Sequence, residues 1–276
     1  MDHPRHFPSR DRLSVLTAVV VLAYTLTRFL ELPTRQIQTT LFGSPLGLEL
    51  NGPALMLLLV AALTSTGADT LIRSHPHLAA RTGQRTVVHW ILPGATALVL
   101  GAALNRAPAG PVWWVGLGLS ALGLIVVLTA EYTAVDRDDP GWQAAALGLM
   151  GLAYLLVLIL FVLLRTGGLR AVIAAPVSGL VAAAVSLRLL ALREAPLNRA
   201  AAYSAAIGVA IAEVIWAITY WRISPIAAGL LALVPFYVGV GLAQQQLAGR
   251  LTRGVWLEYG IIGGLSLGAV LLYALG

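Results

Sequence analysis

The clearest candidate for chemistry in this sequence is Glu213, an acid inside a long apolar stretch. Ionisable side chains in such stretches are costly, so they mark ion pairs, solute pathways or proton relays. On a helix, one side would carry Glu213 together with small residues and a tyrosine, at Ala206, Ala210, Ala217 and Tyr220. Because small residues let helices approach closely, we expect this side to face other helices.

A partner for Glu213 is predicted in the first apolar stretch. Arg28 and Glu31 lie near its end, and Tyr24 lies one helical turn before Arg28. We expect an ion pair or a water-bridged contact between Arg28 and Glu213, with Tyr220 extending a polar path to the surface. The alternative is that this pair only locks two helices together.

A second polar group is expected near the opposite ends of the apolar stretches. Five titratable residues fall there at similar depth, each in a different stretch: Asp69, His89, Glu131, Arg188 and Glu258. Such a layer can form a proton relay, a lipid-headgroup site or a metal site. It can equally consist of side chains that reach the water at helix ends.

Metal, cofactor and soluble-type catalytic sites are not expected. His75, His77 and His89 have the right type for metal binding, but Arg81 and Arg85 between them would repel a cation. The acidic run at 136–139 is interpreted as a solvated turn before a helix rather than a cation site. The chain has no Cys, and none of the catalytic or nucleotide-binding motifs of soluble enzymes is present.

The elements that must position these residues follow from composition. Of the 276 residues, 58% are hydrophobic and only 11% charged, and the mean hydropathy is +0.84. Soluble domains carry roughly 25% charged residues. The sequence therefore predicts an all-α, integral membrane bundle in a single domain over 1–276, and its scattered arginines do not form a nucleic-acid-binding face.

About nine membrane-spanning helices are expected, since about 20 apolar residues cross a bilayer. The predicted spans are 13–31, 53–72, 87–104, 112–134, 142–165, 170–191, 200–221, 225–246 and 254–275. All 18 basic residues are arginines, and loops on one side of the membrane hold 12 of them against 6 on the other. Cytoplasmic loops are rich in basic residues, which predicts residues 1–12 in the cytoplasm, the C-terminus outside and a cytoplasmic (inner) membrane location.

Two further segments carry structural predictions. Residues 36–51, with a Gly-Ser-Pro turn signal, are interpreted either as a short amphipathic hairpin or as a structureless linker. In the last span, Gly260, Gly264 and Gly268 recur every four residues, which is typical of a close helix–helix interface. The partner surface is either this chain's own bundle or another copy of the chain.

Several short motifs carry a resemblance to a known family. They are Glu-Val-Ile-Trp from Glu213, Tyr-Trp-Arg-Ile-Ser-Pro from Tyr220, Gly-Arg-Leu-Thr-Arg from Gly249, His-Trp-Ile-Leu-Pro from His89 and Ala-Glu-Tyr at Glu131. With them the chain resembles an uncharacterised bacterial family of multi-spanning membrane proteins. The resemblance implies a helical membrane fold and no known activity.

Three functions are consistent with these features. The first is a transporter-like or lipid-handling bundle with a lipid or small solute bound near Glu213. The second is a non-catalytic membrane subunit or assembly factor that uses the glycine stripe. The third is an intramembrane enzyme that acts on a lipid-linked substrate at the titratable layer.

Overall fold

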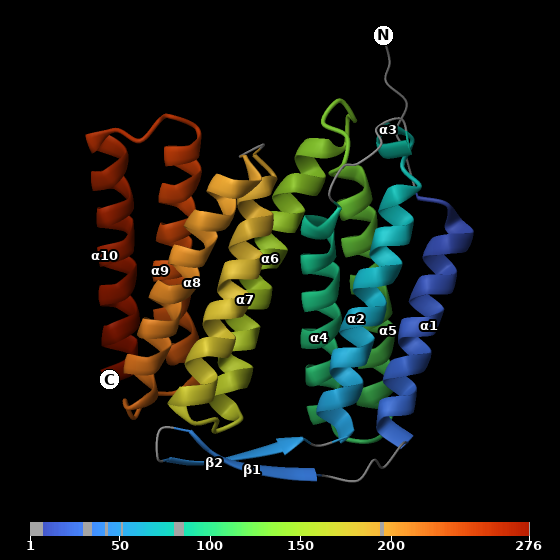
Figure 1. The fold of residues 1–276 in the computed structure, drawn as a ribbon, viewed down its shortest axis with the longest axis horizontal. Helices are drawn as coiled ribbons and strands as arrows, with labels where there is room; N and C mark the ends of the chain where they lie inside the picture. The colour runs from blue at the N-terminus through green and yellow to red at the C-terminus, as the bar shows by residue number, and fades with distance from the viewer. Residues whose placement is uncertain are drawn as a thin grey trace. The chain divides into compact units, whose positions relative to one another are not determined.

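Long helices connected by short loops make up most of the chain (Figure 1). The computed structural model describes residues 8–29, 35–41, 44–50, 52–79, 86–193 and 196–275. Within these ranges, nine helices are long and apolar enough to cross a membrane. The predicted all-α membrane bundle is thereby confirmed.

The nine long helices begin and end within three residues of the predicted spans. They are α1 (Arg10–Phe29), α2 (Gly52–Arg73), η1 with α4 (Val87–Trp90 and Ile91–Arg106), α5 (Pro111–Thr133), α6 (Trp142–Thr166), α7 (Ala171–Ala191), α8 (Leu197–Thr219), α9 (Pro225–Leu247) and α10 (Arg253–Leu275). A single turn, α3 (Pro76–Ala79), follows α2. Proline opens α5 and α9, where its fixed φ suits the first helical turn.

The segment between α1 and α2 forms the predicted hairpin rather than a structureless linker. Strand β1 (Arg35–Leu41) pairs in antiparallel register with β2 (Ser44–Leu50). Strand β2 begins at Ser44, within the predicted Gly-Ser-Pro signal.

The chain divides into two compact units, Met1–Ala145 and Ala146–Gly276. In the first unit, α2 packs against α1, α4 and α5. Tyr24 of α1 is fully buried there and donates a hydrogen bond to the carbonyl of Ala97 in α4 (2.6 Å). The expectation of a single domain remains a prediction.

In the second unit, α7 and α8 form the closest helix pair. A Cβ atom added to Gly179 of α7 would lie 2.7 Å from the carbonyl oxygen of Gly208 in α8, and one added to Gly208 would lie 2.6 Å from that of Gly179. Only glycine therefore allows the two backbones to approach so closely. Helix α9 packs against both α8 and α10.

Candidate functional site

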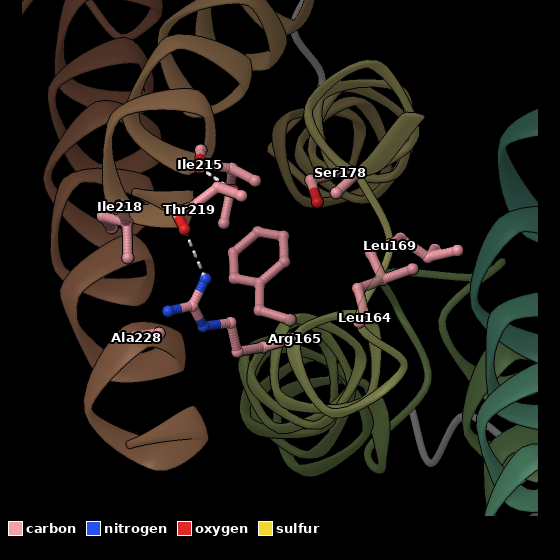
Figure 2. Close-up of a pocket in the computed structure, with 11 residues that line it drawn as sticks. Leu164, Arg165, Leu169, Ser178, Ile215, Ile218, Thr219 and Ala228 are labelled. Atoms are coloured by element: carbon pink, nitrogen blue, oxygen red, sulfur yellow. Dashed lines mark hydrogen bonds between the residues drawn. The ribbon is translucent and has the colours of Figure 1, made fainter. Parts of the chain in front are cut away.

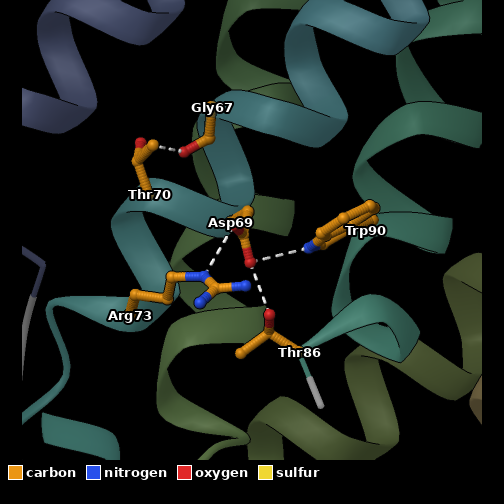
Figure 3. Close-up of polar contacts among 6 residues, drawn as sticks. All are labelled: Gly67, Asp69, Thr70, Arg73, Thr86 and Trp90. Atoms are coloured by element: carbon orange, nitrogen blue, oxygen red, sulfur yellow. Dashed lines mark hydrogen bonds and ion pairs between the residues drawn. The ribbon is translucent and has the colours of Figure 1, made fainter. Parts of the chain in front are cut away.

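Three sets of polar side chains in the described ranges are candidates for function, and the first surrounds Asp69 near the end of α2. Asp69 accepts hydrogen bonds from Thr86 Oγ1 (2.5 Å), Trp90 Nε1 (2.9 Å) and Arg73 Nε (2.7 Å). Figure 3 shows these donors converging on the carboxylate. Thr86 and Trp90 lie at the two ends of the short helix η1, so Asp69 fixes η1 against α2.

The same short helix binds a second acid. Between Thr86 and Trp90, His89 contacts Glu131 of α5, with 2.8 Å between Nδ1 and Oε2. Glu131 exposes none of its side chain, and His89 exposes 16%. Next to Glu131, the ring of Tyr132 packs against that of His75, with 4.6 Å between the ring centroids.

This arrangement brings together three members of the predicted titratable layer. Asp69, His89 and Glu131 meet through η1, which joins α2, α4 and α5 at one end of the first unit. The other two members, Arg188 and Glu258, belong to the second unit, where Arg188 is buried in α7 and Glu258 is exposed on α10. Because Asp69 accepts hydrogen bonds from three side chains and Glu131 contacts His89, the geometry favours an anchor for η1.

The second candidate site is a pocket among four helices of the second unit. It has a volume of about 210 Å³ and lies between the ends of α6 and α8 and the beginnings of α7 and α9. Most of its lining is apolar, with Phe161, Leu164, Leu169, Ile215, Ile218 and Ala228 among the walls. Figure 2 shows Ser178 on one side and Arg165 with Thr219 on the other.

Arg165 carries the charge of this pocket. Its guanidinium donates through Nη1 to the carbonyl of Thr219 (3.0 Å) and through Nη2 to that of Trp221 (2.5 Å), at the C-terminal end of α8. A cation there is favoured by the partial negative charge of the helix end. In the ranges that the structure describes, no carboxylate lies within 4.0 Å of this guanidinium.

Ser178 supplies an unsatisfied polar group in the same pocket. Its side chain is fully buried, and its hydroxyl has no hydrogen-bond partner among the described residues. An unpaired buried hydroxyl costs about 1–3 kcal/mol. A ligand in the pocket could provide the missing partner.

Sequence reasoning missed both of these residues. Arg165 counted only as a loop arginine, and Ser178 lies in an apolar stretch where serine commonly bonds the preceding turn. The available signal was a basic residue at the end of one span facing a serine two turns into the next.

The family of the chain follows from one comparison. The model of the family described as "Protein of unknown function (DUF5656)" matches residues 32–273. The chain belongs to this family. No curated protein and no solved structure matches the chain. The expected membership of an uncharacterised family is confirmed, and its bacterial origin remains a prediction.

The third candidate, Glu213, lies on an open side of α8. It is exposed in a groove of about 450 Å³, whose other walls include Ala175 and Pro176 of α7 and Trp216 of α8. The rest of the predicted stripe is exposed as well: Ala206, Ala210, Ala217 and Tyr220. The expectation that this side of α8 packs against other helices is therefore not met within the second unit.

Of the residues expected to accompany Glu213, Tyr24 and Arg28 belong to the first unit, whereas Glu213 belongs to the second. The hydroxyl of Tyr24 donates a hydrogen bond to the carbonyl of Ala97 in the first unit. Tyr24 therefore contributes to helix packing there and not to a polar path. Arg28 is exposed near the end of α1. It belongs to a different unit from Glu213, so the expected pairing remains a prediction. Glu31 lies outside the described residues.

The glycine stripe of α10 faces open space. A Cβ atom added to Gly260, Gly264 or Gly268 would meet no other described atom within 4 Å. The contact of α10 with α9 instead includes Gly263, next to Val238. Among the described residues of the second unit, packing does not involve the stripe, and a contact of the stripe with another chain remains a prediction.

Proposed function

We propose that the protein is a lipid-handling membrane protein that holds a membrane amphiphile in the pocket between α6, α7, α8 and α9. One observation carries this proposal. The pocket combines apolar walls with a guanidinium at the helix ends and an unpaired hydroxyl about two turns deeper. This is the order of groups along a lipid, whose polar head lies at the membrane surface and whose chains lie inside.

The pocket also has the character of a small-molecule site. Such sites are concave and mostly apolar, with few polar groups that fix the orientation of the ligand. The location within membrane-spanning helices favours a ligand that reaches the pocket from the bilayer.

A non-catalytic subunit is the second candidate function. It is favoured by α10, whose residues are mostly exposed or half-buried among the described residues and whose Gly260, Gly264 and Gly268 face is open. Close helix association in membranes uses such small-residue faces. An intramembrane enzyme has less support, because Asp69 and Glu131 of the titratable layer are both held by protein partners.

The lipid-handling function is tested by filling the pocket. The variant Ser178→Leu places a larger apolar side chain in the lining, and Ala174→Leu does so from the same helix. Ala202→Leu is the matched control, because Ala202 is exposed on α8 and does not line this pocket. Mass spectrometry of each protein, purified in mild detergent, would identify retained lipids.

We expect wild type and Ala202→Leu to retain the same lipid, and both pocket variants to lose at least ~90% of it, with helical content unchanged by circular dichroism. Equal retention by all four proteins would contradict the proposal. Retention of no lipid by wild type, together with one stoichiometric protein partner in every preparation, would favour the subunit instead.

A further inference from the structure

We infer that the ligand of this pocket is an anionic lipid whose negative group binds Arg165 and whose deeper polar group accepts a hydrogen bond from Ser178. The inference rests on the proposed lipid-handling function and names the class of lipid. Diacyl phospholipids with an anionic headgroup, such as phosphatidylglycerol, carry both groups. Their phosphate lies above ester carbonyls, which are hydrogen-bond acceptors.

The negative charge expected of the headgroup follows from the charge and the N–H donors that Arg165 retains. A guanidinium has five N–H donors in a planar fork that suits phosphate and carboxylate groups. Two donors are used by the carbonyls of Thr219 and Trp221, which leaves three. The carbonyls of a helix end carry only about half an elementary charge in total. The site therefore retains positive charge and donors for an anion.

The unpaired hydroxyl of Ser178 indicates that the ligand also carries a hydrogen-bond acceptor below its headgroup. This residue is the eighth of α7, so it lies about 10 Å along the helix from its first residue. Arg165, in contrast, is the last residue but one of α6. Since Ser178 lines the same pocket and its hydroxyl is unpaired, it can donate to a ligand group that lies deeper than the headgroup. A fatty acid has no such second group.

The size of the pocket limits what it encloses. A volume of about 210 Å³ is below the roughly 300–1,000 Å³ of sites that enclose a drug-sized ligand. The pocket can enclose the headgroup and the first part of a lipid, and the acyl chains must continue along the apolar helix surfaces. Selection should consequently depend on the headgroup and ester region rather than on chain length.

The inference is tested with defined lipids and the full chain. The protein is delipidated in detergent, and native mass spectrometry measures binding of phosphatidylglycerol and phosphatidylcholine with identical acyl chains. Oleate and inorganic phosphate are tested as competitors, because they distinguish a two-group lipid from a fatty acid or a free anion. The variants are Arg165→Gln, Arg165→Lys and Ser178→Ala, with Arg106→Gln as the matched control. Arg106 is likewise an arginine at a helix end that donates to a carbonyl.

We expect wild type and Arg106→Gln to prefer phosphatidylglycerol by about tenfold, as one charge-assisted contact gives. Arg165→Gln should lose the preference, and Arg165→Lys should keep part of it. Ser178→Ala should weaken binding of both phospholipids several-fold and leave the preference unchanged. Thermal unfolding of each variant in the same detergent shows whether Arg165 acts only as a cap of α8, in which case stability falls and the preference remains.

Each contrary outcome has a definite meaning. Equal binding of the two phospholipids by wild type, or full competition by oleate or inorganic phosphate, would overturn the inference about lipid class. Lipid binding that Ser178→Leu abolishes would then still support the proposed function. If wild type binds none of these ligands, both the inference and the proposed function are wrong.

Discussion

At the scale of single residues, the contact between His89 and Glu131 is the most strongly buried ionisable pair for which the structure gives a distance. Burial of a carboxylate is favourable only when hydrogen bonds or an opposite charge compensate for the lost water. The 2.8 Å contact with His89 provides such compensation. The pair therefore belongs to the packing of η1 against α5.

We expect Glu131→Ala to lower the free energy of unfolding by roughly 3 kcal/mol, because the buried contact with His89 would be lost and a cavity would remain. Glu131→Gln should cost less, since its amide oxygen can still accept a hydrogen bond from His89. Unfolding in mixed detergent micelles measures the difference.

The matched control for this prediction is Glu258→Ala. Glu258 belongs to the same predicted layer but is exposed on α10, so its removal should change the stability by less than about 0.5 kcal/mol. If Glu131→Ala were as mild as the control, the anchoring role of Glu131 would be wrong.

Part of the candidate sites could be predicted from the types of the residues and from their positions along the membrane-spanning helices. Asp69, His89 and Glu131 could be grouped from the sequence, because each is a titratable residue near the same end of its span. The donors from Thr86 and Trp90 could not, since they depend on how η1 lies against α2. For the same reason, Arg165 and Ser178 line one pocket only after α6, α7, α8 and α9 have assembled.

At the scale of elements, the crossing of α7 and α8 shows how small residues replace hydrophobic exclusion in a membrane. Lipid tails are as apolar as leucine, so helices associate through close packing. Around the crossing, the Cβ position of Gly179 would also meet Ala212, and that of Gly208 would meet Ala183. This pair positions Ser178 and the end of α8 at the pocket.

Gly179→Ala should therefore separate α7 from α8 and destabilise the protein by about 1–3 kcal/mol, as overpacking of a tight contact does. The same substitution at Gly264 should leave the stability unchanged or raise it slightly, because the added methyl meets open space and alanine favours a helix. Thermal unfolding in detergent compares the two variants. Equal losses at both positions would show that α10 packs against something on its glycine face.

At the scale of the whole molecule, the unequal distribution of arginine predicts the orientation in the membrane. The loops and helix ends on the predicted cytoplasmic side carry twice as many arginines as those on the other side, and such a bias sets orientation. The nine described membrane-spanning helices are consistent with termini on opposite sides.

The orientation can be measured with single cysteines, because the natural chain contains no cysteine. We expect Ala109→Cys to react with a membrane-impermeant maleimide added to intact spheroplasts, and Asp138→Cys to react only after the membrane is opened. Both positions lie in exposed turns next to α5. The reverse pattern would mean that the orientation is inverted.

The sequence by itself determined the number of spans and the positions of their ends to within three residues, whereas it left the segment between the first two spans open between a hairpin and a linker. These features depend on local properties: the length of an apolar run, the positions of proline and glycine, and the solvation of charges. Even the glycines of α7, α8 and α10 are visible as small residues at helical spacing.

Only the tertiary structure decided which side of each helix meets another helix. In a membrane, sides that face lipid and sides that face protein are both apolar, so hydropathy does not distinguish them. Among the described residues of the second unit, Glu213 and the α10 glycines consequently lie on open surfaces, whereas Arg165 and Ser178 line one pocket. Which glycine stripe forms the close contact, and which polar residues share a site, depends on the neighbours that each helix acquires on folding.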